Sequence, residues 1–384
     1  MRVAFRLTKR NRYSLVPLIS VMRERLSGVE ISVVDLAGIK SSFYDVLFYS
    51  FMSPDVSWVR KEVREVRSNC RVLIAGGAHP TAKPYETLGM GFDAVVVGEG
   101  EWAVLSLVSD FVRGRLERIY KRSCSFLDYT LEGCPYTAPV EIVRGCVHRC
   151  AFCQVPRLFA GVKHRSVASV LREARILAGR GRKFMRFIAP NALSYMSYDG
   201  VTPNVKALKR LFEGIAGCGI DEIYFGSFPS EVRPESVTVD AARLMSDFCS
   251  NRKVVVGAQS GSDRRLAGLR RGHTVKDVVK AVEVLNRFGF KVVLDFIFGF
   301  PGESHDEQRE TLDFIEYLVS NHFVSIHAHT FIPLPGTPLE RAEPAPIPRW
   351  LRARLHELER EGLLDGYWHK QEKMRGELWK EMAS

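Results

Sequence analysis

The sequence predicts an α/β protein with a Rossmann-like (flavodoxin-type) N-terminal domain, a partial (β/α)6 TIM barrel and a helical C-terminal extension. Short runs rich in Val, Ile, Leu and Phe alternate with longer helix-like runs, as in parallel sheets covered by helices. Residues 126–137 interrupt this alternation with Gly133, Pro135 and little periodicity. After 344–348 only amphipathic helix-like runs follow. We therefore expect domains at 1–125 and 139–340, a linker at 126–138 and an extension at 341–384.

The N-terminal region predicts a parallel sheet of about five strands. These strands are expected at 2–7, 29–36, 45–51, 71–75 and 92–97, with helices at 13–26, 54–68 and 82–88. Ligands of such sheets bind beyond the carboxyl ends of the strands, where paired glycines let the backbone approach a ligand closely. The candidate contacts in this domain are Ser50, Gly76, Gly77, Gly98 and Glu99.

The second region repeats the alternation as six strand–helix units. Strands are expected at 140–144, 184–189, 222–227, 253–259, 291–298 and 324–331, with helices at 167–178, 205–215, 238–249, 274–288 and 305–318. The chemistry of a barrel takes place at the C-terminal ends of its strands. The residues at these ends suit a charged, hydroxyl-rich ligand, and the candidates are Asn191, Ser227, Glu231, Gln259, Ser260, Gly299 and Phe300.

Three cysteines follow the first strand of this second region. Cys146, Cys150 and Cys153 fall within eight residues on a loop that begins with glycine, so their sulfurs can face one point. Thiolates select iron-sulfur clusters or zinc. Three ligands leave one metal position unfilled, as in a 4Fe-4S cluster with one free iron. A structural zinc site would need a fourth ligand, for which His148 and His164 are available.

Composition indicates an ordinary globular protein. The chain has 384 residues, 46% apolar and 26% charged, and no apolar run reaches the ~18 residues of a membrane span. Its N-terminus lacks the features of a signal peptide, so we expect a cytoplasmic protein. The other five cysteines show no framework spacing, and Cys124 and Cys134 are interpreted as bystander thiols rather than a disulfide or auxiliary ligands. The net charge of +11 is spread along the chain, so nucleic acid is not indicated.

The spacing Cys146-x-x-x-Cys150-x-x-Cys153, with Phe152 before the last cysteine, resembles the signature of radical S-adenosylmethionine (SAM) enzymes. The resemblance implies that the three thiolates hold a 4Fe-4S cluster whose free iron binds SAM. The reduced cluster of that family cleaves SAM to methionine and a 5'-deoxyadenosyl radical. It also implies that Phe152 packs near the adenine and that an electron donor such as ferredoxin or flavodoxin is a partner.

Two further segments are similar to SAM-binding strands shared by cobalamin-type radical SAM enzymes and methylthiotransferases. They are Gln-Ser-Gly-Ser at 259–262, followed by Arg-Arg-Gly-His-Thr at 270–274, and Gly-Phe-Pro-Gly-Glu at 299–303. By this resemblance Asn191 meets the methionyl part of SAM, Ser227 and Gln259 meet the ribose or carboxylate, and Gly299 and Phe300 meet the adenine edge. We also expect Glu231 and Ser260 to contact the cofactor.

The N-terminal region resembles the cobalamin-binding domain that precedes the barrel in many radical SAM proteins. Ser50-x-Met52 followed by Gly76-Gly77 is similar to the stretches that hold the nucleotide tail of cobalamin, and 98–101 is typical of the combined family. The Asp-x-His-x-x-Gly loop that supplies a cobalt ligand in some cobalamin proteins is absent after the first strand. His79 is a poor substitute, and a flavodoxin-like domain without cofactor remains open.

The leading hypothesis is a cobalamin-dependent radical SAM methyltransferase that acts on an unactivated carbon of an unknown substrate. One alternative is a tRNA methylthiotransferase, although only Cys70 stands where that family carries three N-terminal cluster ligands. The other is a zinc-stabilised nucleic-acid-binding module. The helical extension is interpreted as a packed cap, in which Tyr367 and Trp368 could line a substrate channel.

Overall fold

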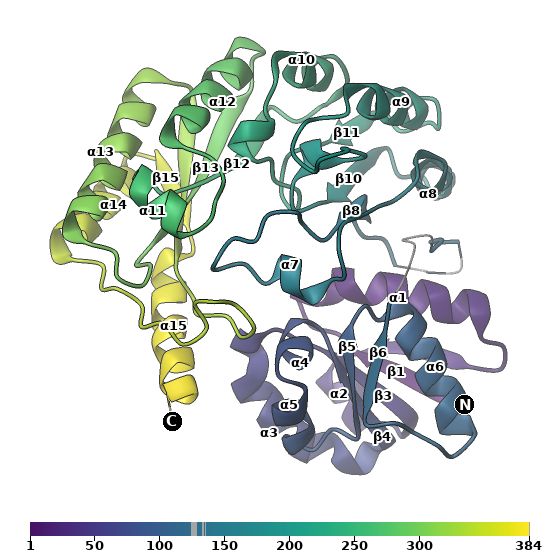
Figure 1. Ribbon diagram of the computed structural model, residues 1–384. Helices are drawn as coiled ribbons and strands as arrows, with labels where there is room; N and C mark the ends of the chain where they lie inside the picture. The colour runs from purple at the N-terminus through teal and green to yellow at the C-terminus, as the bar shows by residue number, and fades with distance from the viewer. Residues whose placement is uncertain (124–128, 133, 135, 384) are drawn as a thin grey trace. The chain divides into compact units, whose positions relative to one another are not determined.

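The computed structural model describes residues 1–123, 129–132, 134 and 136–383, with side chains described up to Gly376 (Figure 1). The chain divides into two compact units. Unit 1 comprises Met1–Pro139 and Arg157–Lys163, and unit 2 comprises Val140–Pro156 and His164–Ser384. The pairings between neighbouring strands of the main sheets are parallel, which confirms the predicted α/β class. Cys124 and part of the predicted linker lie outside the described residues.

Unit 1 contains a six-stranded parallel sheet in the order β2-β1-β3-β4-β5-β6. Its strands are β1 (Arg2–Arg6), β2 (Glu30–Val34), β3 (Tyr44–Ser50), β4 (Cys70–Gly76), β5 (Ala94–Gly98) and β6 (Ile119–Arg122). Its helices are α1 (Arg12–Arg25), α2 (Leu36–Lys40), α3 (Val56–Val66), α4 (Ala78–Ala82), α5 (Pro84–Gly89) and α6 (Glu101–Val112), with 3-10 turns at Ser53–Asp55 and Arg67–Asn69. The sequence prediction missed β6.

The core of unit 1 explains the position of α3. Its buried valines Val56, Val59, Val63 and Val66 recur at helical spacing and pack with Leu73 and other sheet residues in one apolar cluster. The single helix predicted at 82–88 is wrong, because the structure has two helices that meet at Lys83. Pro84 disfavours helical geometry in the residue before it, and Lys83 indeed has φ −132° and ψ 62°.

Unit 2 contains two parallel sheets, in the orders β11-β10-β7 and β12-β13-β14-β15. The strands are β7 (Val140–Glu141), β8 (Val143–Arg144), β9 (Lys163–His164), β10 (Phe184–Ile188), β11 (Glu222–Tyr224), β12 (Lys253–Gln259), β13 (Lys291–Phe298), β14 (Val324–Thr330) and β15 (Leu364–Gly366). The helix α7 (Val155–Leu158) spans the boundary between the two units. The helices that lie in unit 2 are α8 (Val167–Gly179), α9 (Val205–Ala216), α10 (Val239–Phe248), α11 (Asp263–Gly268), α12 (Val275–Arg287), α13 (His305–Asn321), α14 (Arg349–Arg360) and α15 (Trp368–Ala383), with 3-10 turns at Ala192–Ser194 and Pro234–Ser236.

Two predicted elements of unit 2 differ from the structure. The strand expected at 140–144 is divided at Ile142, whose N–H donates to Ile188 while its carbonyl accepts from Arg165, so the chain changes partner there. The extension was expected to be helical throughout, but β15 adds a strand beside β14. The backbone of Ala328 fills the space where a Cβ of Gly366 would lie, so only glycine allows this close approach.

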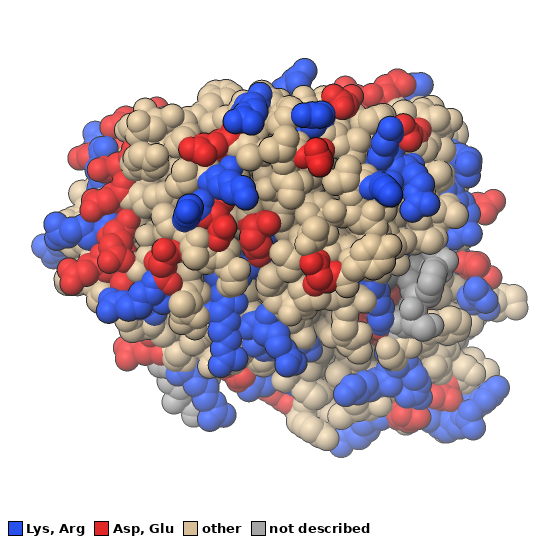
Figure 2. All heavy atoms as spheres, turned by 45° about the horizontal axis from the view of Figure 1, so that its top comes forward, with Lys and Arg blue, Asp and Glu red and all other residues tan. Residues whose placement is uncertain are grey.

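Within the described residues, no helix has the length and apolar character needed to cross a membrane. Figure 2 shows Lys and Arg side chains beside Asp and Glu side chains over much of the drawn face. The cytoplasmic location and the absence of a nucleic-acid partner stay predictions, as do the domain boundaries expected near residues 125, 138 and 340.

Candidate active site

The loop that carries the three thiols begins at the end of β8. Gly145 has φ 79°, a conformation that favours glycine, and it turns the chain out of the strand. Farther along the loop, the N–H of Ala151 donates to the carbonyl of Leu269 at 2.9 Å and so fixes the loop to the segment after α11. None of Cys146, Cys150 and Cys153 forms a disulfide with another described residue, and Cys150 is buried while the other two are half-buried. The loop therefore holds three reduced sulfurs in one small region of unit 2.

Two buried arginines reach Cys150 from different parts of the chain. Nη1 of Arg233 lies 3.7 Å and Nη1 of Arg271 lies 3.6 Å from Cys150 Sγ. Arg271 also donates from Nη2 to the carbonyl of Gly257 at 2.7 Å, and Arg233 pairs with Glu235 at 2.5 Å. Arg271 lies in a segment that the sequence analysis singled out, whereas Arg233, which precedes a proline after β11, has no signal in the sequence.

The thiols need positive charge to become ligands. Burial raises the pKa of Cys153 to about 11 and also raises the pKa of Cys146, and the neighbouring thiols add to both shifts. A metal centre deprotonates such thiols on binding, and the positive charges of Arg233 and Arg271 oppose the rise in the pKa of Cys146. The arrangement therefore fits a cationic metal centre better than three resting thiols.

The spacing of the thiols favours a cluster over a single zinc ion. Thiolates around tetrahedral zinc lie about 3.8 Å apart, given Zn–S bonds of about 2.3 Å. Among the described residues, groups of three ligand atoms mutually within 4.8 Å occur at Asp295, His327 and His329 and at His356, Glu359 and His369, and not at the thiols. The three sulfurs are thus spread more widely than the ligands of one zinc ion.

The two histidines considered as a fourth zinc ligand have other surroundings. Nδ1 of His164 accepts a hydrogen bond from the N–H of Met196 at 3.2 Å. Nε2 of His148 lies 3.6 Å from Glu235, and burial together with Arg233 and Arg271 lowers the pKa of His148 to about 4. His148 is therefore neutral at pH 7 and faces the arginine–glutamate network.

The residues assigned to the adenine of SAM lie together. The Phe152 ring is 5.5 Å from that of Phe300, which is 5.5 Å from that of Phe331. The Phe300 ring is fully buried in this cluster. The expected contact between its side chain and the adenine of SAM is therefore not available in this structure. The N–H of Gly299 donates to Glu303 at 2.8 Å, and the space where its Cβ would lie is filled by Arg375 of α15 and the carbonyl of Ala345.

Four other residues that were predicted to contact SAM differ in whether their polar side-chain atoms already have hydrogen-bond partners within the protein. Asn191 donates to Ser236 at 2.9 Å and accepts from the N–H of Arg233 at 3.2 Å, so it supports the arginine beside Cys150. Ser260 is within 3.2 Å of the Thr311 hydroxyl. Gln259 is buried, with φ 73°. The hydroxyl of Ser227 is buried without a hydrogen-bond partner among the described residues, which leaves it available to a ligand.

Glu231 stands apart from this group because its environment disfavours its charge. Burial and the nearby carboxylate of Asp295 raise the pKa of Glu231 to about 7, against the opposing effects of Arg271 and His329. A perturbed carboxyl group at a strand end is a candidate for substrate or proton binding.

The raised pKa makes the stability of unit 2 depend on pH. The folded protein holds a proton on Glu231 between pH 4.5 and about 7 that the unfolded chain has released, so stability falls as the pH rises through this window. We expect Glu231→Gln to be more stable than the parent at pH 8, by about 1–3 kcal/mol, and similar to it at pH 5. The measurement is the thermal unfolding midpoint of both proteins from pH 5 to 8. If the two midpoints change in parallel with pH, the raised pKa of Glu231 is contradicted.

The predicted contacts in unit 1 line the carboxyl ends of adjacent strands. Ser50 and Gly76 are register partners in β3 and β4. Gly77 has φ 102°, and a Cβ there would lie 2.8 Å from the Phe51 carbonyl, so neighbouring backbone already requires glycine. The N–H of Gly98 donates to Thr81 at 3.0 Å. Glu99 is buried and forms an ion pair with Lys163. The sequence analysis expected Glu99 to contact a cofactor, but in the structure its carboxylate is occupied by this pair.

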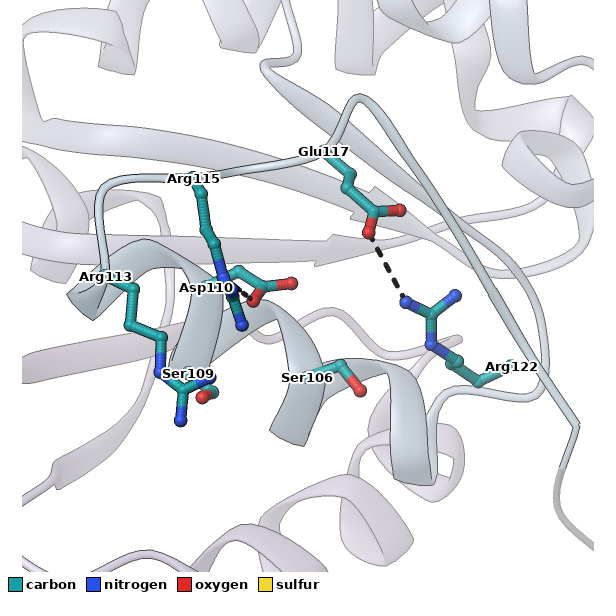
Figure 3. A pocket seen from close by; sticks show the side chains of 7 residues that line it. All are labelled: Ser106, Ser109, Asp110, Arg113, Arg115, Glu117 and Arg122. Carbon is teal, nitrogen blue, oxygen red and sulfur yellow. Dashed lines mark hydrogen bonds and ion pairs between the residues drawn. The ribbon is translucent and has the colours of Figure 1, made fainter.

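A hollow of about 520 Å³ in unit 1 lies between α6 and the edge strand β6 (Figure 3). It is lined by Ser106, Ser109, Asp110, Arg113, Arg115, Glu117 and Arg122. Arg115 pairs with Asp110 at 3.0 Å and Arg122 with Glu117 at 3.5 Å. None of the predicted contacts of unit 1 is among its lining residues, so the hollow is separate from the glycine-rich strand ends.

Comparisons with known proteins agree with the thiol site. The model of the radical SAM superfamily matches residues 140–315. An uncharacterized protein of Methanopyrus kandleri is 25% identical over 369 residues, which cover 80% of this chain and 69% of the relative. The tRNA-2-methylthio-N(6)-dimethylallyladenosine synthase of Sulfurihydrogenibium sp. is 29% identical over 228 residues, which cover 58% of this chain and 49% of the synthase. The match thus spans about half the length of that synthase.

Among solved structures, the radical S-adenosylmethionine methyltransferase TsrM from Kitasatospora setae, with cobalamin and a 4Fe-4S cluster bound, superposes with a TM-score of 0.72. The superposition covers 88% of this chain and 74% of that chain at 15% identity, so the likeness concerns the fold. The family match, by contrast, begins at β7 and includes all three thiols. Residues 140–315 therefore form a radical SAM domain.

Proposed function

We propose that this protein is a radical SAM enzyme that binds a 4Fe-4S cluster, SAM and cobalamin and methylates an unactivated carbon of its substrate. The observation that carries the proposal is the group of three cysteine thiols on one loop, with two buried arginines at Cys150. When bound, the cluster supplies the electron that cleaves SAM to a 5'-deoxyadenosyl radical, and cobalamin supplies a carrier for the methyl group. The substrate remains open, and ferredoxin or flavodoxin is the proposed electron donor.

The residues of unit 2 would bind and position these groups. Cys146, Cys150 and Cys153 would ligate three irons, and Arg233 and Arg271 would offset the negative charge of the thiolates. The aromatic cluster of Phe152, Phe300 and Phe331 would exclude water next to the loop. The unpartnered hydroxyl of Ser227 is the predicted contact that is best prepared to bind a hydroxyl or carboxylate of SAM.

The finer fold assignment is part of the same proposal. The order β2-β1-β3-β4-β5 is that of flavodoxin-like doubly wound sheets, which bind ligands at the carboxyl ends of their strands. The parallel strands of unit 2, from β7 to β14, are interpreted as a partial (β/α)6 barrel. The likeness in fold to TsrM, a cobalamin-binding radical SAM methyltransferase, supports both interpretations.

Cobalamin would bind at Ser50, Gly76, Gly77 and Gly98, where side chains are small or absent. The loop after β1 offers no histidine, and Asn11 in that loop donates to the carbonyls of Arg6 and Ser50. His79 is buried, contacts Ser53 at 3.2 Å, and burial lowers its pKa to about 4. The residues that would hold cobalamin therefore include no histidine from the loop after β1.

A tRNA methylthiotransferase is the second candidate because a synthase of that class shares 29% identity over 228 residues of this chain. Cys70, the one N-terminal thiol at a comparable position, is buried at the start of β4, whereas Gly76 ends the same strand. Cys134 is also buried, and Cys124 lies outside the described residues. A second cluster in unit 1 therefore has little support among the described thiols.

Anaerobic reconstitution with iron and sulfide, followed by hydroxocobalamin and gel filtration, tests the proposal. We expect about four irons per chain, SAM-dependent release of 5'-deoxyadenosine and retained cobalamin. Stoichiometric zinc without 4Fe-4S absorption would instead support the zinc-stabilised nucleic-acid-binding module. About eight irons per chain, or strong stimulation of SAM cleavage by tRNA, would favour the methylthiotransferase.

A further inference from the structure

Two histidines and a glutamate lie together where α14 meets the start of α15. His356 and Glu359 are three residues apart on α14, a spacing that places both side chains on one face of the helix. His369 is the second residue of α15. One ligand atom from each of the three residues lies within 4.8 Å of the other two. Two helices thus supply one compact group of metal-type ligands, which we call the two-helix site.

The distances in the two-helix site match those between ligands of a single zinc ion. Oε2 of Glu359 lies 3.2 Å from Nδ1 of His356 and 3.3 Å from Nε2 of His369. Zinc bonds of about 2.0–2.2 Å to nitrogen and oxygen, at tetrahedral angles, separate two ligand atoms by about 3.4 Å. One carboxylate oxygen and two ring nitrogens are therefore already spaced for one ion.

A buried tryptophan fixes the orientation of the three side chains. Nε1 of Trp368 donates to Oε1 of Glu359 at 2.8 Å, so Oε2 is the oxygen that faces the histidines. The Trp368 ring is fully buried, and its centroid lies 3.5 Å from that of the His369 ring and 5.2 Å from that of the His356 ring. Such contacts with the remaining atoms of the ligands are what keep metal-binding side chains in place.

The ring nitrogens beside Glu359 are accessible to an ion from solvent. The side chains of His356 and His369 are 52% and 44% exposed, and that of Glu359 is 26% exposed. Among the described residues, the hydrogen-bond partner found for both rings is Glu359. The opposite nitrogen of each ring can therefore carry the ring proton toward water while the nitrogen beside Glu359 binds a metal.

A second group of possible ligands lies on β13 and β14. The ligand atoms of Asp295, His327 and His329 are also within 4.8 Å of one another. Oδ1 of Asp295 is 3.7 Å from Nε2 of His329, which is wider than the two distances in the two-helix site and than the separation expected around one zinc ion. The two-helix site is therefore the better match, and variants of both groups are needed to tell which one binds an ion.

We propose that His356, Glu359 and His369 bind a divalent transition-metal ion such as Zn²⁺, which joins the start of α15 to α14. Imidazole nitrogen and carboxylate oxygen are both ligands that zinc accepts. The exposed side of the site leaves the fourth position of the ion to water. The proposal concerns the attachment of the extension and goes beyond the proposed function.

A bound ion strengthens the contact between α15 and the strand ends of unit 2. Gln371 of α15 accepts from the N–H of Thr330, the last residue of β14, at 2.8 Å. Arg375 is buried and donates to the carbonyl of Ala345 at 3.1 Å. Opening of α15 separates His369 from the other two ligands, so an ion bound to all three opposes this opening. The attachment of α15 therefore depends on metal.

Limited proteolysis of the full chain with trypsin, with and without zinc chloride, measures this attachment. Lys370 and Lys373 are exposed cleavage points on α15. We expect cleavage there to slow about 100-fold at a free zinc concentration about 100 times the dissociation constant, because the open helix lacks the site. By equilibrium dialysis, we expect the parent to bind one more zinc per chain than His369→Ala, and this variant to show no zinc-dependent protection.

Glu357→Gln is the matched control for Glu359→Gln. Both substitutions remove one carboxylate charge from α14, and Glu357 pairs with Arg354 outside the two-helix site. Glu359→Gln should lose the extra zinc and the protection, whereas Glu357→Gln should keep both. Equal zinc content and equal protection in the parent and in these variants would overturn the proposal. Loss of the extra zinc in His327→Ala, with retention in His369→Ala, would also overturn it and place the ion on β13 and β14.

These measurements are independent of the proposed function. All the variants keep the three thiols, so zinc bound by Cys146, Cys150 and Cys153 cancels when two proteins are compared. Failure of iron reconstitution counts against the proposed function and leaves the comparison of zinc contents interpretable. Equal zinc contents in parent and variants count against the two-helix site alone, so the two failures are distinguishable.

Discussion

Replacement of Cys150 by alanine is expected to reduce bound iron from about four per chain to less than one and to bring SAM cleavage to background. The two remaining thiols cannot hold three irons of a cluster. The substitution also removes the sulfur that both Arg233 and Arg271 contact. Two buried guanidinium groups then lose this shared partner. Iron content and 5'-deoxyadenosine, measured after anaerobic reconstitution, report the two effects separately.

Two controls separate this result from general loss of structure. Cys218→Ala removes a half-buried thiol of the same unit, whose sulfur lies 3.7 Å from the Leu171 carbonyl, and this variant should retain iron. His148→Ala should also retain iron, because His148 faces Glu235 rather than serving as a fourth ligand. Full iron and full cleavage in Cys150→Ala would remove the basis for the proposed cluster. Loss of metal in His148→Ala would favour a Cys3His zinc site.

The parts of the fold that could be predicted are those whose signal is local. Alternating apolar runs located most strands, and the proximity of three cysteines on a glycine-started loop located the thiol site. β15 escaped prediction because it is three residues long and depends on Gly366 lying against Ala328, a contact between distant segments. Pro84 did give a local signal for the break between α4 and α5, which the prediction did not use.

The residues that complete the site could not be predicted, because tertiary packing brings them there. Arg233 follows β11 and reaches a sulfur 83 positions earlier in the chain. Gln371 and Arg375 belong to α15 and contact His329 and the space beside Gly299, so the extension interpreted as a cap contributes side chains to the strand ends. For Phe300 the sequence motif predicted a ligand contact that the structure does not support, because its ring is fully buried.

The return of the thiol loop to the sheet depends on a buried ion pair. Arg165 follows β9 and is completely buried, as is Glu173 of α8, and the two side chains meet at 2.8 Å. Arg165 also donates from Nε to the Ser169 hydroxyl at 2.9 Å. Its backbone N–H donates to Ile142 at 3.0 Å, and its carbonyl accepts from the Tyr195 hydroxyl at 2.7 Å. One residue thereby joins the end of the loop to α8 and to the first strands of unit 2.

Glu173→Ala is expected to lower the stability of unit 2 by about 3–5 kcal/mol, because it removes the carboxylate that pairs with a fully buried arginine. For a unit of this size that corresponds to a fall of about 10 °C in unfolding midpoint, measured by calorimetry. Glu213→Ala is the matched control, since its pair with Lys209 on α9 is exposed and should contribute at most about 0.5 kcal/mol. Equal midpoints for the two variants would contradict the role of the buried pair. A partial recovery in the double variant Arg165→Met, Glu173→Leu would show that the unpaired charge, and not the lost volume, causes the damage. Because the three thiols are unchanged, Glu173→Ala should still bind iron well below its midpoint, which distinguishes a loop that is poorly held from a loop that lacks a ligand.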